Sequence, residues 1–376
     1  MTQSHFITGA TGFVGSYVLI ELLKQTNDTI YCLVRPKEDQ APEARIFGLL
    51  DKLIPAYQEN PALLAAARRR VRIVAGDLSE SVLEIAPRIE SPINCFWHVA
   101  ASLNYEERFA DQIFETNVMG THYALRLAKK LQTQYFNHFS TAYVVGKQQG
   151  IMREEVVRHT ESNNAYERSK VTSELEVLSA TGMQTRIFRP SIVIGHSLTH
   201  EAFNFSGMYG FLRRLVQFRG MMERIQTGYL DRNPIRMKMD PQVPLNLVPV
   251  DQVAQEAVQI GTTAAPQRIF NLTNKKVLTV GETIGIMFDI AGVSQPEIVR
   301  DAADFNWIDE KFNEKMEFYN SYLVGRKVFD RRNTDAALQR ASDHDQYAIT
   351  RDRLVYKSSW YLNKLLSKRV RIPVSR

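Results

Sequence analysis

The chain opens on a short apolar run that is followed at once by three closely spaced glycines. HFIT at residues 5–8 is typical of a buried strand, and the apolar stretch SYVLIELL after the glycines is typical of a helix. In such a unit Gly9 permits a tight turn, Gly12 lets the backbone approach a pyrophosphate, and Gly15 allows close helix packing. The helix N-terminus then attracts phosphate charge. The unit predicts a dinucleotide site, against the alternative of a purely structural turn, with the contact residues Gly9, Thr11, Gly12, Phe13, Val14 and Gly15.

Short β-rich runs alternate with longer helical patterns through the first half of the chain. We expect strands at residues 5–8, 29–34, 71–76, 94–99, 135–140 and 185–190. Helical patterns begin near Gly12, Glu43, Glu107 and Asn163. This alternation predicts an α/β fold with a Rossmann-type, doubly wound parallel sheet.

The rhythm changes after His196, where Gly, Pro and aromatic residues gather and the alternation loosens. A helical pattern returns at 250–261 and a strand at 268–273, and an aromatic-rich helical segment runs from about Asp304 to the end. We therefore expect residues 1–275 to form the dinucleotide-binding domain, with a smaller substrate lobe inserted at about 196–245. Residues 276–376 are expected to form a mostly helical C-terminal substrate region.

The residues that follow the second and third strands bear on the choice of dinucleotide. An acid at the end of the second strand is typical of NAD sites, but this chain has Arg35 and Lys37 there. A guanidinium pairs well with a 2′-phosphate, so NADPH is favoured; the alternative is that Arg35 is a solvated loop cation. Asp77, followed by Leu78, would accept from the adenine amino group or simply cap the next helix.

Small side chains follow the fourth strand in HVAAS, where they would let the cofactor lie against the backbone at Ala100, Ala101 and Ser102. His98 in the same motif is expected to satisfy a local hydrogen bond rather than to do chemistry. Asn117, on the next helix, would face the same edge of the sheet. It would either order a water chain near Lys170 or bond the backbone locally.

Tyr166 and Lys170 have the i, i+4 spacing that places two side chains on one helix face. An ammonium beside a phenol stabilises the phenolate, so we expect the pKa of Tyr166 to fall toward neutrality and the residue to act as acid or base. The alternative is a solvated helix face. Ser140 and Thr141 end the fifth strand, where a hydroxyl would donate to a substrate carbonyl or merely terminate the strand.

Taken together, TGATGFVG, HVAAS, NVMGT, FSTAYVVG, YERSK and RPSIVIG resemble the extended short-chain dehydrogenase/reductase superfamily over roughly the first 275 residues. CLVR, the insertion ending ARRRVRIVAGDL, LNYEERF and NLVPVDQVA are similar to its thioester reductase and fatty acyl-CoA reductase branch, and EKMEFYNSYLVGRKVFDRRNTDAAL is similar to fatty acyl reductase tails. The resemblance implies a catalytic triad with an assisting residue, namely Thr141, Tyr166, Lys170 and Asn117. Besides the glycine loop, it implies cofactor contacts from Arg35, Lys37, Asp77, Leu78, Ala100, Ala101, Ser102, Tyr166, Lys170, Phe188, Pro190 and Ile192.

The reaction that this resemblance implies is NADPH-dependent reduction of an acyl thioester, carried on CoA or on an acyl-carrier protein, to an aldehyde. A second hydride would give the alcohol. The same triad also serves sugar-nucleotide epimerases or dehydratases and hydroxysteroid-type dehydrogenases, and a non-enzymatic NADPH-sensing protein would share the fold. The acyl chain, the carrier, the oxidation level of the product and the oligomeric state stay open.

Charge is concentrated at the C-terminus. Lys and Arg number 47 against 41 Asp and Glu, and the last twenty residues hold Lys357, Lys364, Lys368, Arg369, Arg371 and Arg376 without any acid. A general nucleic-acid-binding surface is therefore not expected. With Trp360, Tyr361 and the nearby leucines, the tail would pack on the core with a solvated basic face, touch an anionic membrane weakly, or meet an acidic carrier protein or CoA phosphates.

Cys32 and Cys95 fall in apolar runs that read as buried strands, so neither a disulfide framework nor a covalent acyl-cysteine mechanism is expected. His196 and His200 have a zinc-like spacing but lack a third ligand nearby, so no metal is expected. The N-terminus lacks the pattern of a signal peptide, and no run is long and apolar enough to span a bilayer. A cytoplasmic protein is the expectation.

Overall fold

The computed structural model describes residues 3–37, 39–79, 82–158, 160–203, 205, 207–340 and 347–369. A seven-stranded sheet with the order β11-β7-β5-β4-β1-β2-β3 runs through it, and every neighbouring pair is parallel. The strands are β1 Ser4–Thr8, β2 Thr29–Val34, β3 Val71–Ala75, β4 Cys95–His98, β5 Tyr135–Phe139, β7 Gln184–Pro190 and β11 Ile269–Leu272. The predicted Rossmann-type sheet is confirmed, since each expected strand is present within a residue or two.

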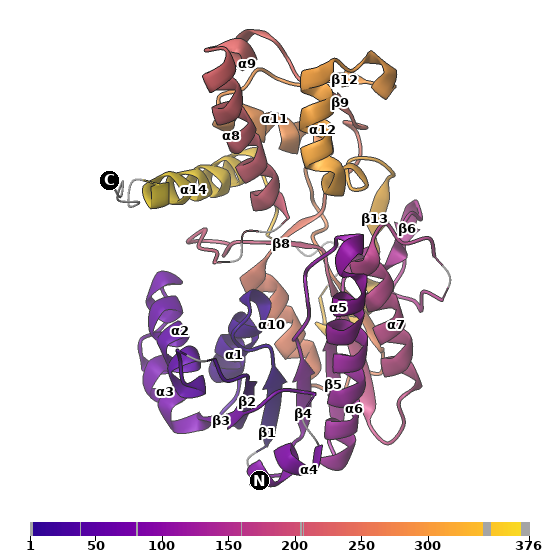
Figure 1. The fold of residues 1–376 in the computed structure, drawn as a ribbon. Helices are drawn as coiled ribbons and strands as arrows, with labels where there is room; N and C mark the ends of the chain where they lie inside the picture. The colour runs from indigo at the N-terminus through magenta and orange to yellow at the C-terminus, as the bar shows by residue number, and fades with distance from the viewer. Residues whose placement is uncertain are drawn as a thin grey trace.

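Helices cover both faces of the sheet, as Figure 1 shows. One face carries α1 Phe13–Gln25 and α10 Val250–Gly261, with α2 Pro42–Ala56 and α3 Ala62–Arg70 toward the β3 edge; the other carries α4 Val82–Ile85, α5 Ala110–Phe114, α6 Gly120–Lys130 and α7 Ala165–Ser179. Alternate strand residues feed the two apolar layers: Ile7 packs in one and Phe6 in the other. Both faces are dry, which explains the continuous apolar runs of the strands.

The strand order reverses between β1 and β4. β2 and β3 lie on one side of β1, whereas β4 and the later strands lie on its other side. Open α/β sheets bind ligands at such a switch point, beyond the carboxyl ends of the strands. The loops that leave β1 and β4 both lie at this edge, beneath the upper lobe in Figure 1.

The upper lobe is built from segments on both sides of residue 276. It contains α8 Met208–Ile225, α9 Tyr229–Arg232, α11 Val280–Ala291 and α12 Trp307–Asn320, with β9 Arg236–Lys238 paired to β12 Glu297–Val299. A second short pair, β8 Ile192–Ile194 with β10 Leu247–Pro249, lies where the chain passes between sheet and lobe. The division at residue 275 stays a prediction.

The expectation of one helical segment from Asp304 to the end is wrong. After α12 the chain forms β13 Lys327–Phe329, which pairs with β6 Gly150–Met152, and then α13 Arg332–Ala337 and α14 Arg351–Arg369. The stretch FDRRN docks on the sheet: Arg331 pairs with buried Glu256 at 3.0 Å, and the Asn333 amide donates to the Ile269 carbonyl of β11 at 3.1 Å. Part of the C-terminal region thus returns to the edge of the sheet, because the side chains of Arg331 and Asn333 donate hydrogen bonds to backbone carbonyls of β11.

The C-terminal helix α14 packs against α11 and α8, which favours the core-packing interpretation of the tail. Tyr361 is 2% exposed, Lys357 is fully buried, and Lys364 pairs with Glu201 at 2.9 Å. Of the cations assigned to a basic tail surface, Lys357 is therefore internal, and the half-buried Lys364 is engaged in an ion pair. Arg371 and Arg376 lie outside the described residues, as do the side chains of Lys368 and Arg369, and lipid contact by the tail stays a prediction.

Within the described ranges no helix combines the length and apolarity needed to cross a bilayer. The cytoplasmic location stays a prediction.

Candidate functional site

A cavity of about 780 Å³ lies at the carboxyl edge of the sheet, at the β1–β4 switch point. Its lining runs from the glycine loop, past the ends of β2, β3, β4 and β5, to the lobe helices α8, α11 and α12. Most of the predicted site residues border this one cavity: Gly9, Thr11, Gly12, Phe13, Val14, Gly15, Arg35, Asp77, Leu78, Ala100, Ala101, Thr141, Tyr166, Lys170, Pro190 and Ile192.

The glycine loop is packed too tightly for side chains. Gly9 has φ +75°, and a Cβ on it would lie 2.6 Å from the backbone nitrogen of Ala100. A Cβ on Gly15 would lie 2.1 Å from the Gly9 carbonyl oxygen, so the helix N-terminus rests directly on the turn. Backbone rather than side chains therefore faces the cavity here, which is the surface that a pyrophosphate needs.

Two arginines border the cavity beyond β2. Arg35 lies at the end of the strand with its side chain 76% exposed, and its Nε is 3.5 Å from Oδ2 of Asp77. Arg45, on α2, donates to the Arg35 carbonyl and lies 3.5 Å from the Thr11 hydroxyl. Sequence reasoning missed Arg45, because it lies ten residues after Arg35, in a helix whose packing decides where the side chain is directed. Lys37 is exposed and is not among the described residues that line the cavity.

Asp77 lies at the cavity and also orders its own loop. Its Oδ1 accepts from the backbone N–H of Ser79 at 3.0 Å and from the Ser79 hydroxyl at 2.9 Å. This resembles the capping alternative for Asp77, while Leu78 borders the cavity as expected. A direct bond from Asp77 to adenine stays a prediction.

Asn117 does not reach the cavity. It is 1% exposed, in a π-helical turn at Glu115–Met119, and its Oδ1 accepts from the Ser102 N–H at 2.7 Å. Its Nδ2 donates to the Ser102 carbonyl and to the Ser169 hydroxyl at 2.9 Å. The local bonding alternative for Asn117 therefore describes the structure: the residue ties the loop after β4 to α7, and Ser102 is turned into that network.

Phe188 was expected at the cofactor and lies elsewhere. Its side chain is fully buried among the rings of Trp97, Phe139 and Phe270, because Phe188 lies within β7 in the core layer rather than at the carboxyl end of the strand. Pro190 and Ile192, two and four residues further, do border the cavity.

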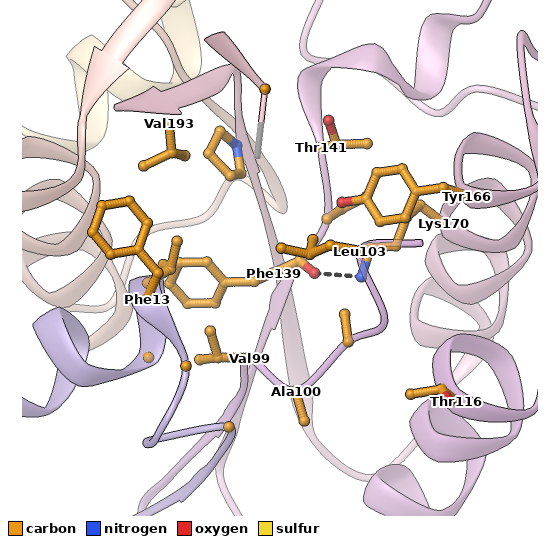
Figure 2. Close-up of a pocket in the computed structure, with 18 of the residues that line it drawn as sticks. Phe13, Val99, Ala100, Leu103, Thr116, Phe139, Thr141, Tyr166, Lys170 and Val193 are labelled. Atoms are coloured by element: carbon orange, nitrogen blue, oxygen red, sulfur yellow. Dashed lines mark hydrogen bonds between the residues drawn. The ribbon is translucent and has the colours of Figure 1, made fainter. Parts of the chain in front are cut away.

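Thr141, Tyr166 and Lys170 come together at one wall of the cavity, as Figure 2 shows. The Asn164 side chain caps α7 by accepting from the Glu167 N–H at 2.9 Å, which fixes the helix start two residues before Tyr166. The Lys170 ammonium donates to the Phe139 carbonyl at 2.6 Å. The helix face that the i, i+4 spacing predicted is therefore directed at the carboxyl end of β5.

The expected pKa shift of Tyr166 is wrong in sign. Burial raises the pKa of Tyr166, and the neighbouring Glu167 carboxylate adds to the effect. Burial also lowers the pKa of Lys170 to about 8, although Glu174 acts in the opposite sense. Because the ammonium is directed at the Phe139 carbonyl, it does not offset the cost of burying a phenolate. Tyr166 is therefore protonated at neutral pH and suited to donate.

The hydroxyls at the end of β5 also face the cavity. Thr141 Oγ1 accepts from the Tyr143 N–H at 3.2 Å, which leaves its own hydrogen available for donation. Ser140 is 5% exposed, borders the cavity, and its hydroxyl has no hydrogen-bond partner among the described residues. A buried hydroxyl without a partner is costly unless a ligand satisfies it.

The lobe end of the cavity is apolar, and none of its residues was predicted individually as a site residue. Its residues are Met208, Phe211, Leu245, Leu247, Ile284, Met287, Tyr319, Tyr322 and Leu323. None of these described residues carries a charge. They come from α8, α11, α12, β10 with the segment that leads into it, and the segment after α12. The motifs that contain Leu247, Tyr319, Tyr322 and Leu323 indicated a family but not which side chains face the cavity.

His98, His196 and the two cysteines have structural surroundings. His98 is buried between the hydroxyls of Thr8 at 2.9 Å and Thr121 at 3.2 Å, and burial lowers its pKa to about 3. His196 Nδ1 accepts two backbone N–H bonds, and within the described ranges no three His, Cys, Asp or Glu side chains gather as a metal-ligand set. Cys32 and Cys95 are fully buried, and burial raises the pKa of both thiols.

Comparisons with known proteins agree with this geometry. Residues 7–257, more than half of the chain, match the NAD-binding family model described as male sterility protein. A putative fatty acyl-CoA reductase of Drosophila melanogaster is 30% identical over 262 residues, which cover 57% of this chain and 47% of the relative. The chain spans 5% to 56% of the lengths of the curated relatives that it matches.

Solved structures show the same fold at lower identity. The terminal R domain of the myxalamid PKS-NRPS biosynthetic pathway is 24% identical, with a TM-score of 0.70 over 100% of this chain and 93% of that one. A UDP-glucose 4-epimerase of Thermotoga maritima is 14% identical, with a TM-score of 0.62 over 97% of this chain and 100% of that one. The fold alone does not separate these two activities, but the match of the family model over most of the sheet does assign the family: the chain belongs to the NAD-binding male sterility protein family.

Proposed function

We propose that the protein reduces an acyl thioester, carried on CoA or on an acyl-carrier protein, with hydride from NADPH. The observation that carries this proposal is the single cavity in which Thr141, Tyr166 and Lys170 stand between a dinucleotide cradle and an uncharged, apolar lobe wall. The fatty acyl-CoA reductase named among the relatives supports the same reaction class.

The cofactor end of the cavity fits a nicotinamide dinucleotide. The glycine loop offers backbone where a Cβ would collide, and the family of the chain is an NAD-binding one. NADPH is favoured over NADH because Arg35 and Arg45 border the cavity where the second strand ends, and guanidinium groups suit a 2′-phosphate. Bound there, the cofactor supplies hydride; the side chains around it bind, orient and donate.

At the reacting carbonyl, Tyr166 and Thr141 would each donate a hydrogen bond to the oxygen on which negative charge develops. The raised pKa of Tyr166 keeps its hydroxyl protonated for this purpose at neutral pH. Lys170, with its pKa lowered to about 8, lies on the same helix face and would hold the cofactor ribose. The hemithioacetal formed by one hydride would collapse to aldehyde and thiol, and a second round would give the alcohol.

The test is NADPH oxidation by the purified protein against acyl-CoAs from short to long chain, with NADH and a free aldehyde as parallel reactants. Release of CoA thiol in step with NADPH loss is the expected result, and aldehyde turnover would show that the reaction continues to alcohol. Tyr166→Phe is expected to lower kcat by about 10² to 10⁴-fold while leaving the Kd for NADPH unchanged.

The cofactor assignment has its own control. Arg35→Ala and Arg45→Ala are expected to weaken NADPH and leave NADH binding nearly unchanged, because only NADPH carries the 2′-phosphate. Equal losses for both cofactors would contradict the assignment. Absence of thiol release with every acyl-CoA and with an acyl-carrier protein would refute thioester reduction and favour a hydroxysteroid-type dehydrogenase, whose substrate the apolar wall would also accept. A sugar-nucleotide epimerase is less supported, since the described residues of the lobe wall include no cation that could bind a diphosphate.

A further inference from the structure

The segment that follows α12 enters the cavity beside the catalytic helix. Tyr322 and Leu323 border the cavity, and the Tyr322 hydroxyl donates to Oε1 of Glu167 at 2.9 Å. Tyr322 and Glu167 are 155 positions apart in the sequence. Glu167 directly follows Tyr166 in the first turn of α7. The wall of the lobe is therefore bonded to the helix that carries the catalytic tyrosine.

Glu167 is a rigid anchor for this bond. Its side chain is fully buried, and its Oε2 accepts from the Asn163 N–H at 2.8 Å at the N-terminal end of α7, where the helix dipole favours a carboxylate. Burial raises the pKa of Glu167, while these hydrogen bonds and the Lys327 ammonium act in the opposite sense. A buried carboxyl group of this kind is costly without its partners, so the Tyr322 hydroxyl is held firmly.

Tyr322 is also held from other sides. Its ring meets that of Tyr143 edge to face, with centroids 5.0 Å apart, and the Asn164 amide donates to its oxygen at 3.3 Å. The next residue, Leu323, accepts at its carbonyl from the Asp240 N–H at 3.0 Å. The segment is thus fixed to the catalytic helix at one end and to the lobe at the other.

We infer that Tyr322 is a positioning residue that fixes, through Glu167, the distance between the lobe wall and the Tyr166 hydroxyl, and so determines which acyl chains fit beside the catalytic cluster. This inference rests on the proposed function. Its physical basis is that a wall bonded to α7 cannot move away from Tyr166 to admit a longer chain without breaking a buried hydrogen bond.

The test compares two substrates that differ only in acyl length, octanoyl-CoA and palmitoyl-CoA. In Tyr322→Phe the ring and its packing remain, whereas the hydroxyl's bond to Glu167 and its weaker bond from the Asn164 amide are lost. The ratio of kcat/KM for the two substrates is expected to change by about two- to tenfold, the range that one hydrogen bond supports. The change is expected in the thioester KM, with the NADPH KM unchanged. A smaller folded fraction would lower kcat/KM equally for both substrates and would leave their ratio unchanged.

Two further variants separate positioning from general stability. Glu167→Gln retains a hydrogen bond to the Tyr322 oxygen, with the amide donating, so its ratio is expected near that of the wild type. Tyr347→Phe removes a comparable hydroxyl, which donates to the Ser197 carbonyl at 2.7 Å and lies outside the described lining of the cavity. Its ratio is expected to equal that of the wild type.

An unchanged ratio and thioester KM in Tyr322→Phe would overturn the inference. A second measurement tests the wall without turnover. Calorimetry gives the Kd values of octanol and hexadecanol for the wild type and for Tyr322→Phe, and the ratio of the two Kd values is compared between the proteins. If the wild type reduces no thioester, the proposed function fails, while the alcohol ratio still decides the role of Tyr322. Failure of both alcohols to bind to the wild type would overturn the inference as well.

Discussion

The buried ammonium of Lys357 leads to a quantitative prediction of pH-dependent stability. Lys357 lies in α14, and its Nζ donates to the His196 carbonyl at 2.6 Å and to the Gly195 carbonyl at 3.3 Å. Burial lowers the pKa of Lys357 to about 7, with Arg353 acting in the same sense and Asp251 opposing. We predict that Lys357→Met removes a dependence of the unfolding free energy on pH that the wild type shows.

The magnitude follows from proton linkage. A lysine in the unfolded chain holds its proton up to about pH 10.5, whereas Lys357 in the folded protein releases it near pH 7. The unfolded chain therefore binds more protons throughout this window, and stability rises with pH. The penalty for burying the amine is about 4 kcal/mol at pH 7 and about 2 kcal/mol at pH 9. Relative to the methionine variant, the wild type should gain about 2 kcal/mol between these two pH values.

The assay is urea unfolding of both proteins at pH 7, 8 and 9, followed by tryptophan fluorescence. Groups that titrate alike in both proteins cancel when the two unfolding free energies are subtracted. Burial lowers the pKa values of the neighbouring His196 and His200, so both rings stay neutral between pH 7 and pH 9. Lys311→Met, at a fully exposed lysine, serves as the control and should leave the pH dependence unchanged. Parallel curves for the wild type and Lys357→Met would refute the reasoning, since they would mean that the ammonium remains charged in the fold.

Three further predictions concern the cavity and the core. Gly9→Ala, at φ +75° and with its Cβ against backbone, should raise the Kd for NADPH at least about tenfold in a fluorescence titration; Gly48→Ala, whose Cβ meets nothing within 4 Å, should instead stabilise the fold by about 0.5–1 kcal/mol. Ser140→Ala should keep or raise the melting temperature but lower kcat/KM for the thioester about tenfold, because its unpartnered hydroxyl serves a ligand; unchanged kinetics would contradict that role. Glu174→Gln leaves the guanidinium of buried Arg189 without its carboxylate, at 2.9 Å in the wild type, and should cost about 3–5 kcal/mol in urea unfolding.

The sheet and the cofactor end of the cavity could be predicted because their signals are local. A strand buried on both faces reads as an apolar run, and a turn that excludes Cβ atoms reads as glycine. The loop contacts of Gly9 and Gly15 lie within a few residues of each other in the sequence. The common location of Tyr166 and Lys170 at the cavity could be predicted for the same reason, since they share one helix face.

Where a side chain points, and which residues from distant parts of the chain it contacts, could not be predicted. Arg45 reaches the cavity because α2 packs beside the end of β2, and Lys357 is internal because the carbonyls of the 195–197 loop surround it. In a linear sequence Lys357 reads only as one more cation in an acid-free tail. Phe188 shows the same limit on a smaller scale, because a pattern locates a strand but does not tell which of its residues lies far enough along it to reach the cavity.

The two ends of the cavity therefore differ in the amino-acid substitutions that they can tolerate. The cofactor end is mostly backbone, held by glycines that tolerate no Cβ, so substitutions there act on binding of the dinucleotide as a whole. The lobe end is built from side chains of α8, α11 and α12, each replaceable by another apolar residue without disturbing the sheet. Tyr322, in the segment after α12, differs because its hydroxyl joins the lobe wall to α7. Under the proposed function, a change in the acyl group accepted would thus arise mainly from lobe residues such as Met287 and Ile284. The bond from Tyr322 to Glu167 would keep the altered wall at the same distance from Tyr166.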